Sequence, residues 1–317
     1  MSPRARFVAR RLALTVPTLL AMSVFVFLLI RLVPGDPVRT MLGFRATPEN
    51  VATVRAQLRL DDPLPAQYAT WLTNLLQGDL GQDYVSGVPV RTLISQRLPV
   101  TAELTLLAML FGVVAGVPLG VLAAQGGRVA RRIADGFVVA GVAIPDFWLG
   151  TLLVLLFAAT LGWLPPSGWS PLSHGLAENL RYIVLPALAL GIGEAAYITR
   201  TTRSAMAQVL GEPFVQFLRA KGLRERDIVF RHALRNAAMP IVTVAGIQFG
   251  VLLGGAIVVE TIFGLPGLGR LVVTAIDQRN YTVVQGGVLV IATMFILVTL
   301  VTDLLYGWLD PRVEESS

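Results

Sequence analysis

The sequence predicts an all-α integral membrane protein with six transmembrane helices, a long outer loop region and a short cytoplasmic helix. Hydrophobic residues make up 54% of the 317 residues, charged residues make up 15%, and the mean hydropathy is +0.67. Soluble domains carry about 25% charged residues, so the chain lies outside their range. Apolar runs long enough to cross a bilayer recur along the chain, with arginines clustered at their ends, as topology determinants do.

The composition excludes several kinds of site. The chain has no cysteine, hence no disulfide and no thiolate metal site, and its two histidines, His174 and His232, lie far apart in sequence. Lys221 is the only lysine, and it lies between Ala220 and Gly222 rather than in the Gly-Lys-Ser/Thr of an ATP-binding loop. We therefore expect no metal site, no cofactor in this chain and no catalytic residue. The net charge of +6 comes from arginines at span ends, which argues against a nucleic-acid partner.

The N-terminal segment, 1–11, is predicted to be cytoplasmic, and the first span is predicted at 12–31. Arginines without any acid precede a charge-free run from Leu12 to Ile30. Those nineteen residues exceed a signal-peptide core, and no cleavage site follows, so we expect an uncleaved span.

A long extracytoplasmic lobe is predicted at 32–97. Tyr68, Leu72 and Leu75 have helical spacing, so the lobe is expected to be helical in part. We interpret it both as a lid over the spans and as a landing surface for a partner that carries substrate.

The remaining boundaries follow from the apolar runs and the charges between them. They are 98–124 for the second span, 136–161 for the third, 162–180 for an outer loop, 181–203 for the fourth, 204–236 for a cytoplasmic loop, 237–260 for the fifth, 261–282 for an outer loop dipping toward the pore, 283–305 for the sixth and 306–317 for a cytoplasmic tail. The short loop before the third span is marked as cytoplasmic by arginines at 128, 131 and 132. Six spans return the C-terminus to the cytoplasm.

Small residues and charges give the spans their local features. Glycines at every fourth position of the second span let helices approach closely. These are Gly112, Gly116 and Gly120. The segment 261–282 mixes glycine, proline and charges, and non-helical backbone at membrane depth survives only when it is buried or lines water. That is why we expect a dipping loop there.

Two acids lie inside the apolar runs of the predicted spans, Asp146 beside Pro145 in the third and Glu194 in the fourth. A charge at membrane depth is costly and is a functional candidate by default. We take Asp146, Glu194 and Gln248 as candidates for the translocation path. The alternative for each acid is a pairing with a neighbour near the membrane boundary.

The stretch 200–240 carries eight basic residues against three acids, so it cannot lie in lipid. Glu212 and Pro213 are typical of a helix start, and Gly222 of a helix end. Apolar residues about one turn apart give the intervening helix a hydrophobic face. They are Phe214, Val215 and Leu218. This is a docking element, unless the arginines serve only to fix topology.

Within that stretch, RAKGLRERDIVFRHALRNAAMP resembles the EAA loop of ABC importer permeases, in the variant of dipeptide, oligopeptide and nickel importers. The general pattern is Glu-Ala-Ala, three residues, Gly, nine residues, Ile-x-Leu-Pro. Gly222 and Leu234 match it, and Pro240 follows as in the peptide branch. The triplet is replaced by Gln-Phe-Leu at 216–218, and Arg235 replaces the first proline. Further matches are Pro-Gly-Asp-Pro at 34–37 and the segment 260–281.

The resemblance implies the type I ABC importer permease fold, in the first-permease (B-type) branch of the peptide and nickel importers. It implies a coupling helix that seats in an ATPase, formed by Glu212, Pro213, Phe214, Val215, Leu218, Arg219, Ala220, Lys221 and Gly222. Implied partners are a second related permease in a heterodimer, two ABC ATPase subunits that bind ATP and Mg, an extracytoplasmic substrate-binding protein, and membrane lipid. The implied location is a bacterial inner membrane, with both termini cytoplasmic.

The implied function is import of di- and oligopeptides by alternating access, with nickel complexes or glutathione as alternative cargo. An ATP-independent channel or carrier would predict internal repeats and charges along several spans, and we find no convincing repeat. A membrane enzyme is disfavoured because no His-Glu-x-x-His occurs and neither histidine lies in a span beside a candidate serine.

Overall fold

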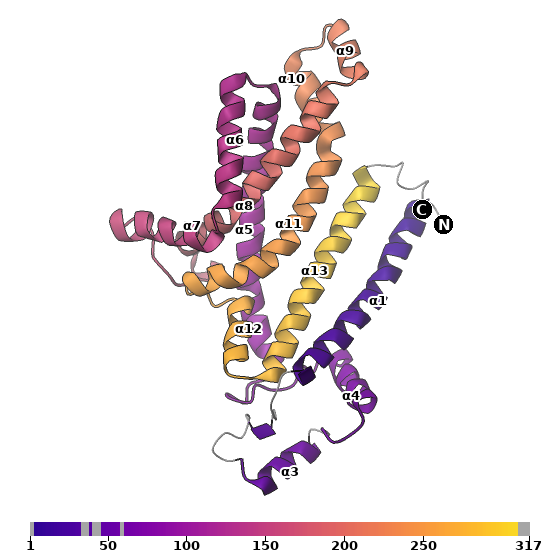
Figure 1. Ribbon diagram of the computed structural model, residues 1–317, viewed down its shortest axis with the longest axis vertical. Coiled ribbons are helices and arrows are strands. Elements are labelled where there is room, and N and C mark those ends of the chain that lie inside the picture. The colour runs from indigo at the N-terminus through magenta and orange to yellow at the C-terminus, as the bar shows by residue number, and fades with distance from the viewer. Residues whose placement is uncertain (1–2, 33–37, 40–45, 58–59, 310–317) are drawn as a thin grey trace. The chain divides into compact units, whose positions relative to one another are not determined.

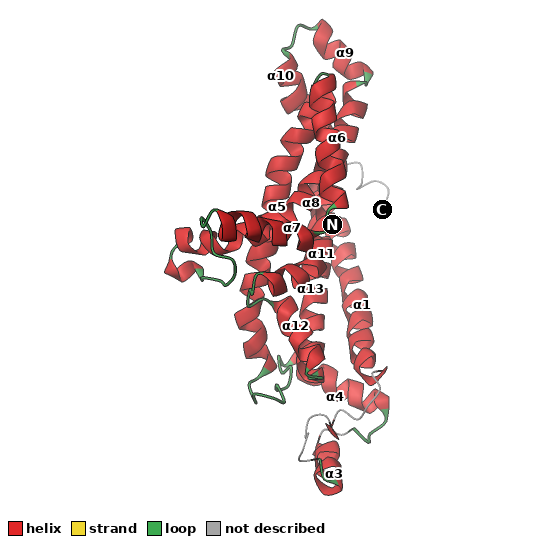
Figure 2. Ribbon diagram, turned by 60° about the vertical axis from the view of Figure 1, so that its left-hand side comes forward, coloured by secondary structure: helices red, strands yellow, loops and turns green. Residues whose placement is uncertain are grey.

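The computed structural model describes residues 3–32, 38–39, 46–57 and 60–309, and in these residues the secondary structure is helical apart from one isolated bridge between Gln82 and Pro89 (Figures 1 and 2). The predicted Pro-Gly-Asp-Pro exit at 34–37 and the end of the tail, 310–317, lie outside the described residues. The chain divides into two compact units. Unit 1 comprises Met1–Leu12, Ala102–Leu265 and Leu297–Ser317, and unit 2 comprises Ala13–Thr101 and Pro266–Ile296.

Five of the described helical segments are long and apolar enough to cross a membrane, and a sixth crossing results if one bent helix pair counts as a span. The helices that carry the five are α1 (Pro3–Leu32), α5 (Val90–Gln125), α8 (Leu176–Leu210), α11 (Leu234–Ile262) and α13 (Tyr281–Leu309). The all-α membrane architecture expected from the sequence is confirmed. Helix α5 begins eight residues before the predicted second span.

The predicted third span is broken in the structure. Helix α6 (Arg128–Ala143) includes the three arginines predicted to lie in a loop, and it is followed by α7 (Asp146–Leu153) and the π-helical segment η2 (Val154–Thr160) at a bend of 103°. The cause is Pro145, because a proline disfavours the helical conformation of the residue before it. Ile144 is extended accordingly, with φ −84° and ψ 120°. The direction of α7 therefore differs sharply from that of α6 (Figure 2).

The centre of unit 1 is α8, which packs against α6, α7 and α11. The glycines predicted to allow close approach lie on α5 and face α8. A Cβ built at Gly116 would lie 2.8 Å from the carbonyl oxygen of Ala195, and the Thr199 hydroxyl donates a hydrogen bond of 3.2 Å to the Gly116 carbonyl. Helix backbones this close leave no room for side chains between them, so the positions facing each other must stay small.

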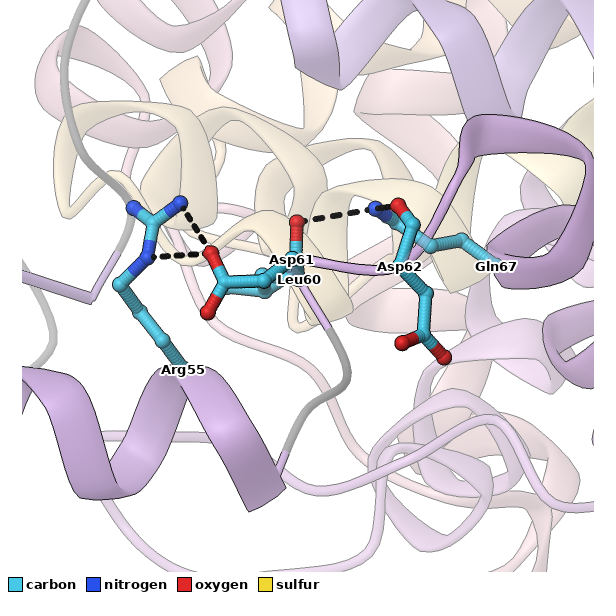
Figure 3. A network of polar contacts seen from close by, with 5 residues as sticks. All are labelled: Arg55, Leu60, Asp61, Asp62 and Gln67. Atoms are coloured by element: carbon cyan, nitrogen blue, oxygen red, sulfur yellow. Dashed lines mark hydrogen bonds and ion pairs between the residues drawn. The ribbon is translucent and has the colours of Figure 1, made fainter.

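In unit 2, the described part of the predicted lobe contains two short helices, α3 (Pro48–Gln57) and α4 (Leu64–Leu76), and the first turns of α5. Figure 3 shows the turn before α4, where Arg55 binds Asp61 through Nε and Nη2 at 3.0 and 2.9 Å, and the Gln67 amide donates to the carbonyls of Leu60 and Asp62. These bonds fix the direction in which the chain enters α4.

Helix α4 is held to α1 within unit 2 by an aromatic cluster. The Tyr68 ring meets Phe27 edge-on at 5.2 Å between centroids, and its hydroxyl lies 2.7 Å from the Ser23 hydroxyl. Trp71 completes the cluster, 5.7 Å from Phe27. The predicted helical spacing around Tyr68 is thus confirmed.

The segment 261–282, which we expected to be a loop, contains helix α12 (Leu268–Asp277). Leu268, Val272 and Ala275 are spaced at helical intervals and are buried in the core of unit 2, together with Val90 and Val283. The glycines and charges suggested a loop, but this apolar face outweighs them. The Thr101 hydroxyl accepts a hydrogen bond of 2.8 Å from the Leu268 N–H at the helix start.

Candidate functional site

The region predicted as a cytoplasmic loop, 204–236, is largely helical. Helix α8 continues to Leu210, and it is followed by α9 (Pro213–Ala220), α10 (Glu225–Asp227) and the π-helical segment η4 (Ile228–Ala233), which runs directly into α11. Within unit 1, α9 and α10 lie at one end of the long helices (Figure 1).

The predicted limits of α9 are confirmed. Glu212 is the residue before the helix, with extended φ −72° and ψ 149°, and Pro213 is the first helical residue. Proline suits this position because its missing N–H would have no partner there. Gly222 ends the helix with φ +80°, a left-handed conformation in which a Cβ is strained.

The apolar face of α9 differs from the predicted docking face. Val215 is fully buried, and Phe214 and Leu218 are half-buried, whereas the Phe217 side chain is 59% exposed. Helix α9 packs against η4, whose Ile228, Val229 and Ala233 are also buried. The predicted face therefore serves at least in part to hold α9 to its own unit, and Phe217 is the large apolar side chain that α9 leaves outside.

The sequence pattern did not single out Phe217, because the predicted face includes Val215 and Phe217 lies about 160° around the helix from Val215. A usable signal was present four residues later. The Lys221 ammonium lies 4.5 Å from the centroid of the Phe217 ring, a cation–π contact between positions i and i+4. The exposed surface of α9 thus combines an aromatic ring with a positive charge.

Arg219 is predicted as a coupling residue, and the structure gives it an internal partner. Its Nε lies 2.6 Å from Oε1 of Glu225, so the pair spans the turn between α9 and α10. The hydrogen bond with Glu225 raises the pKa of Arg219. Both side chains are largely exposed, so the contact orients the turn and adds little stability.

The three candidates for the translocation path come together in unit 1 although they are distant in sequence. Asp146 is the first residue of α7, Glu194 lies in the middle of α8, and Gln248 lies in α11. Glu194 is 6% exposed, and both the Gln248 side chain and the Asp146 carboxyl group lie near enough to influence its ionisation. Oε2 of Glu194 is buried without a hydrogen-bond partner among the described residues.

Among the described residues, no arginine or lysine forms an ion pair with Asp146 or Glu194, whereas Arg203 on α8 pairs with Asp135 on α6. His174 is exposed in the short helix η3 (Leu172–His174).

Two family models match this chain. One, described as "Binding-protein-dependent transport system inner membrane component", matches residues 116–315, and a second, described as the N-terminal part of such a membrane component, matches residues 4–105. The chain belongs to this family of transport-system membrane components.

Related permeases match this chain over nearly its whole length. It is 40% identical over 97% of its residues and 98% of the relative to a probable peptide ABC transporter permease, y4tP, of Sinorhizobium fredii. It is 42% identical, with the same coverage, to the glutathione transport system permease GsiC of Salmonella choleraesuis. It is 40% identical, again with that coverage, to the dipeptide transport system permease DppB of Escherichia coli.

A solved structure supports the fold. The permease is similar to a chain of the MetNI methionine ABC transporter in inward facing conformations, with a TM-score of 0.54 and 21% identity over 69% of this chain and 96% of that one. At this identity the likeness concerns the fold alone. The chain has the ABC importer permease fold and is a non-catalytic, multi-pass inner membrane component, and no cofactor is expected in it.

Proposed function

We propose that this chain is the membrane subunit of an ABC importer that moves small peptides or glutathione inward by alternating access. One observation carries the proposal: full-length relatives at 40–42% identity are named for peptide, dipeptide and glutathione transport. Both cargo classes stay in the proposal because the relatives of the two kinds are about equally similar.

The proposed complex contains this chain, a second related permease, two ATPase subunits and an external binding protein, in a lipid bilayer. ATP closes the ATPase dimer, and the difference in free energy between its open and closed states biases the membrane subunits between two conformations. This chain holds no ATP-binding lysine, so it receives that bias by contact.

Helix α9 is the proposed point of contact, with the predicted coupling residues 212–215 and 218–222 holding its shape. Buried Val215 fixes the helix to η4, and exposed Phe217 with Lys221 faces the ATPase. A short helix anchored through its apolar side to the base of α11 moves as a lever together with that helix. Gly222→Ala should strain the helix end by about 1–2 kcal/mol, and we expect weaker coupling of ATP hydrolysis to uptake.

The proposed topology has both termini in the cytoplasm, α9 on the same side, and residues 32–97 outside. Six crossings follow if the bent pair α6 and α7 counts as one span, which is consistent with an arginine-rich N-terminus inside. The predicted segment boundaries are proposed on the same basis. Asp146, Glu194 and Gln248 are proposed to border the translocation path.

The test is reconstitution of the complete complex in proteoliposomes with its binding protein, followed by uptake of radiolabelled dialanine and of glutathione. Uptake of at least one cargo that requires ATP and the binding protein is the expected result. Transport of solute or hydrolysis of nucleotide by this chain alone would overturn the proposal.

A further inference from the structure

Two carboxyl groups inside unit 1 lack any positive partner among the described residues. Asp146 begins α7 and Glu194 lies in the middle of α8, and each belongs to a segment long and apolar enough to cross a membrane if the bent pair α6 and α7 counts as one span. Burying a carboxylate without compensation costs several kcal/mol, and two neighbouring carboxylates add their repulsion. An occupant that supplies positive charge would offset both costs.

The unsatisfied acceptors of this cluster are specific atoms. Oε2 of Glu194 is buried and has no hydrogen-bond partner among the described residues, and the residue as a whole is only 6% exposed. The Gln248 side chain lies near the Glu194 carboxyl group, and the carbonyl oxygen of its amide is a further acceptor.

Two glycines on neighbouring helices lie beside the Asp146 carboxyl group. A Cβ built at Gly193 on α8 would lie 3.3 Å from Oδ1 of Asp146, and one built at Gly255 on α11 would lie 3.8 Å from Oδ2. Gly255 is seven residues after Gln248, so the two share one face of α11. The carboxylate of Asp146 thus rests between two glycines, on the side of α11 that also carries Gln248.

We infer that Asp146, Glu194 and Gln248 form a binding site for a primary ammonium group, namely the free amino group of the peptide or glutathione cargo. An ammonium presents three N–H donors and no acceptor, and the cluster presents three acceptor side chains and no cation. A bare metal cation is a poorer match, since hard cations take six or more oxygen ligands. This inference rests on the proposed function, because it assigns a role toward that cargo.

Binding can be measured on the complete permease–ATPase complex in detergent without the binding protein. Dialanine, N-acetyl-dialanine, sodium chloride and potassium chloride are titrated separately, with binding read from thermal stabilisation and calorimetry. Dialanine is expected to bind and its N-acetyl form to bind at least tenfold more weakly. Equal binding of the two forms overturns the inference, and so does saturable binding of sodium or potassium with no effect of dialanine.

The variants Glu194→Gln and Asp146→Asn then separate a binding role from a structural one. Each removes a charge that lacks compensation, so each should raise the melting temperature of the empty complex while lowering dialanine affinity and turnover of uptake at least tenfold. Glu178→Gln is the matched control, because Glu178 lies in the first turn of the same helix and is exposed. A purely structural pair would lose stability and transport together.

The outcomes distinguish this inference from the proposed function. If both neutral variants transport dialanine and glutathione as the wild-type complex does, the ammonium site is wrong and the importer stands. If the wild-type complex moves neither cargo, the proposed function fails first. Gln248→Lys gives an independent check, because a tethered ammonium at this position should occupy the site, stabilise the empty complex and block uptake; undiminished uptake contradicts the inference.

Discussion

Helix α9 and the cluster of Asp146, Glu194 and Gln248 differ in how the sequence encodes them. The limits of α9 are written in adjacent residues, with Pro213 at the start and Gly222 at the end. The cluster takes one residue from each of three helices, and only the packing of α7, α8 and α11 brings them together. Local signals therefore give position and shape, whereas a site in the membrane interior depends on tertiary contacts.

The strongest test of α9 is Val215→Asp. Val215 is fully buried against η4, and a carboxylate there has no compensation, so the anchoring should weaken by about 3–5 kcal/mol. We expect uptake to be abolished while the basal ATPase rate of the complex persists. Gln216→Asp, an exposed neighbour on the same helix, is the control. Retained coupled uptake in Val215→Asp would show that α9 needs no anchor.

The next largest effect is expected for Phe217→Ala. An aromatic anchor at a protein interface contributes about 2 kcal/mol, roughly 30-fold in affinity, so ATP-driven uptake should fall by about that factor. The melting temperature should not change, because the ring is mostly exposed. Phe214→Ala, at a half-buried position, should lower the melting temperature as well. Equal thermal effects in the two variants would remove the distinction between an anchoring and a docking residue.

Gly112→Ala on α5 is expected to disturb the position of Glu194 on α8 without changing any residue of the cluster. A Cβ at Gly112 on α5 would lie 2.8 Å from the Cβ of Glu194, so α5 and α8 would be forced apart at about 1–3 kcal/mol. Gly136→Ala is the matched control, since a Cβ there meets nothing within 4 Å, and helix propensity should stabilise it by about 0.5–1 kcal/mol. Thermal unfolding measures both. Similar melting temperatures would mean that α5 and α8 are not in tight contact.

Asp83, outside the spans, gives the smallest effect and a contrast with the acids of the cluster. Burial alone would raise its pKa, but hydrogen bonds from Ser86, from the Val85 N–H and from Asn280 outweigh burial and lower it. A carboxyl group whose pKa is lower in the folded than in the unfolded state stabilises the fold at pH values above the unfolded-state pKa. This contribution is lost as the pH falls through the folded-state pKa.

We therefore expect Asp83→Asn to cost less than about 1 kcal/mol at neutral pH and to flatten the loss of stability on acidification. Unfolding followed as a function of pH measures this, with Asp62→Asn, exposed in the turn before α4, as the control. An unchanged acid-side slope in Asp83→Asn would contradict the assignment.

Most of the fold was predictable because apolar runs, flanking arginines and the glycine spacing of α5 are local properties of the sequence. The bend at Pro145 and helix α12 were not predicted. In the first case a continuous apolar run concealed the effect of one proline, and in the second, glycines and charges concealed an apolar face that only packing against Val90 and Val283 makes visible.

The candidate site was predictable to a similar degree. The sequence located α9 and the acids Asp146 and Glu194, but it could not say that Val215 faces inward and Phe217 outward, since both faces of α9 are partly apolar. The unsatisfied Oε2 of Glu194 could not be predicted from the sequence. Whether a buried acceptor lacks a donor depends on which side chains the other helices place beside it.

The most direct test of the central claim uses the absence of cysteine from the chain. A single Phe217→Cys substitution in the complete complex gives one defined point for a short bifunctional cross-linker, and Val85→Cys, 68% exposed in unit 2, is the control. We predict that Phe217→Cys is cross-linked to the ATPase subunit, with a yield that changes when ATP is bound, and that Val85→Cys is not. A complex that couples ATP to uptake while Phe217→Cys never reaches the ATPase would contradict the account.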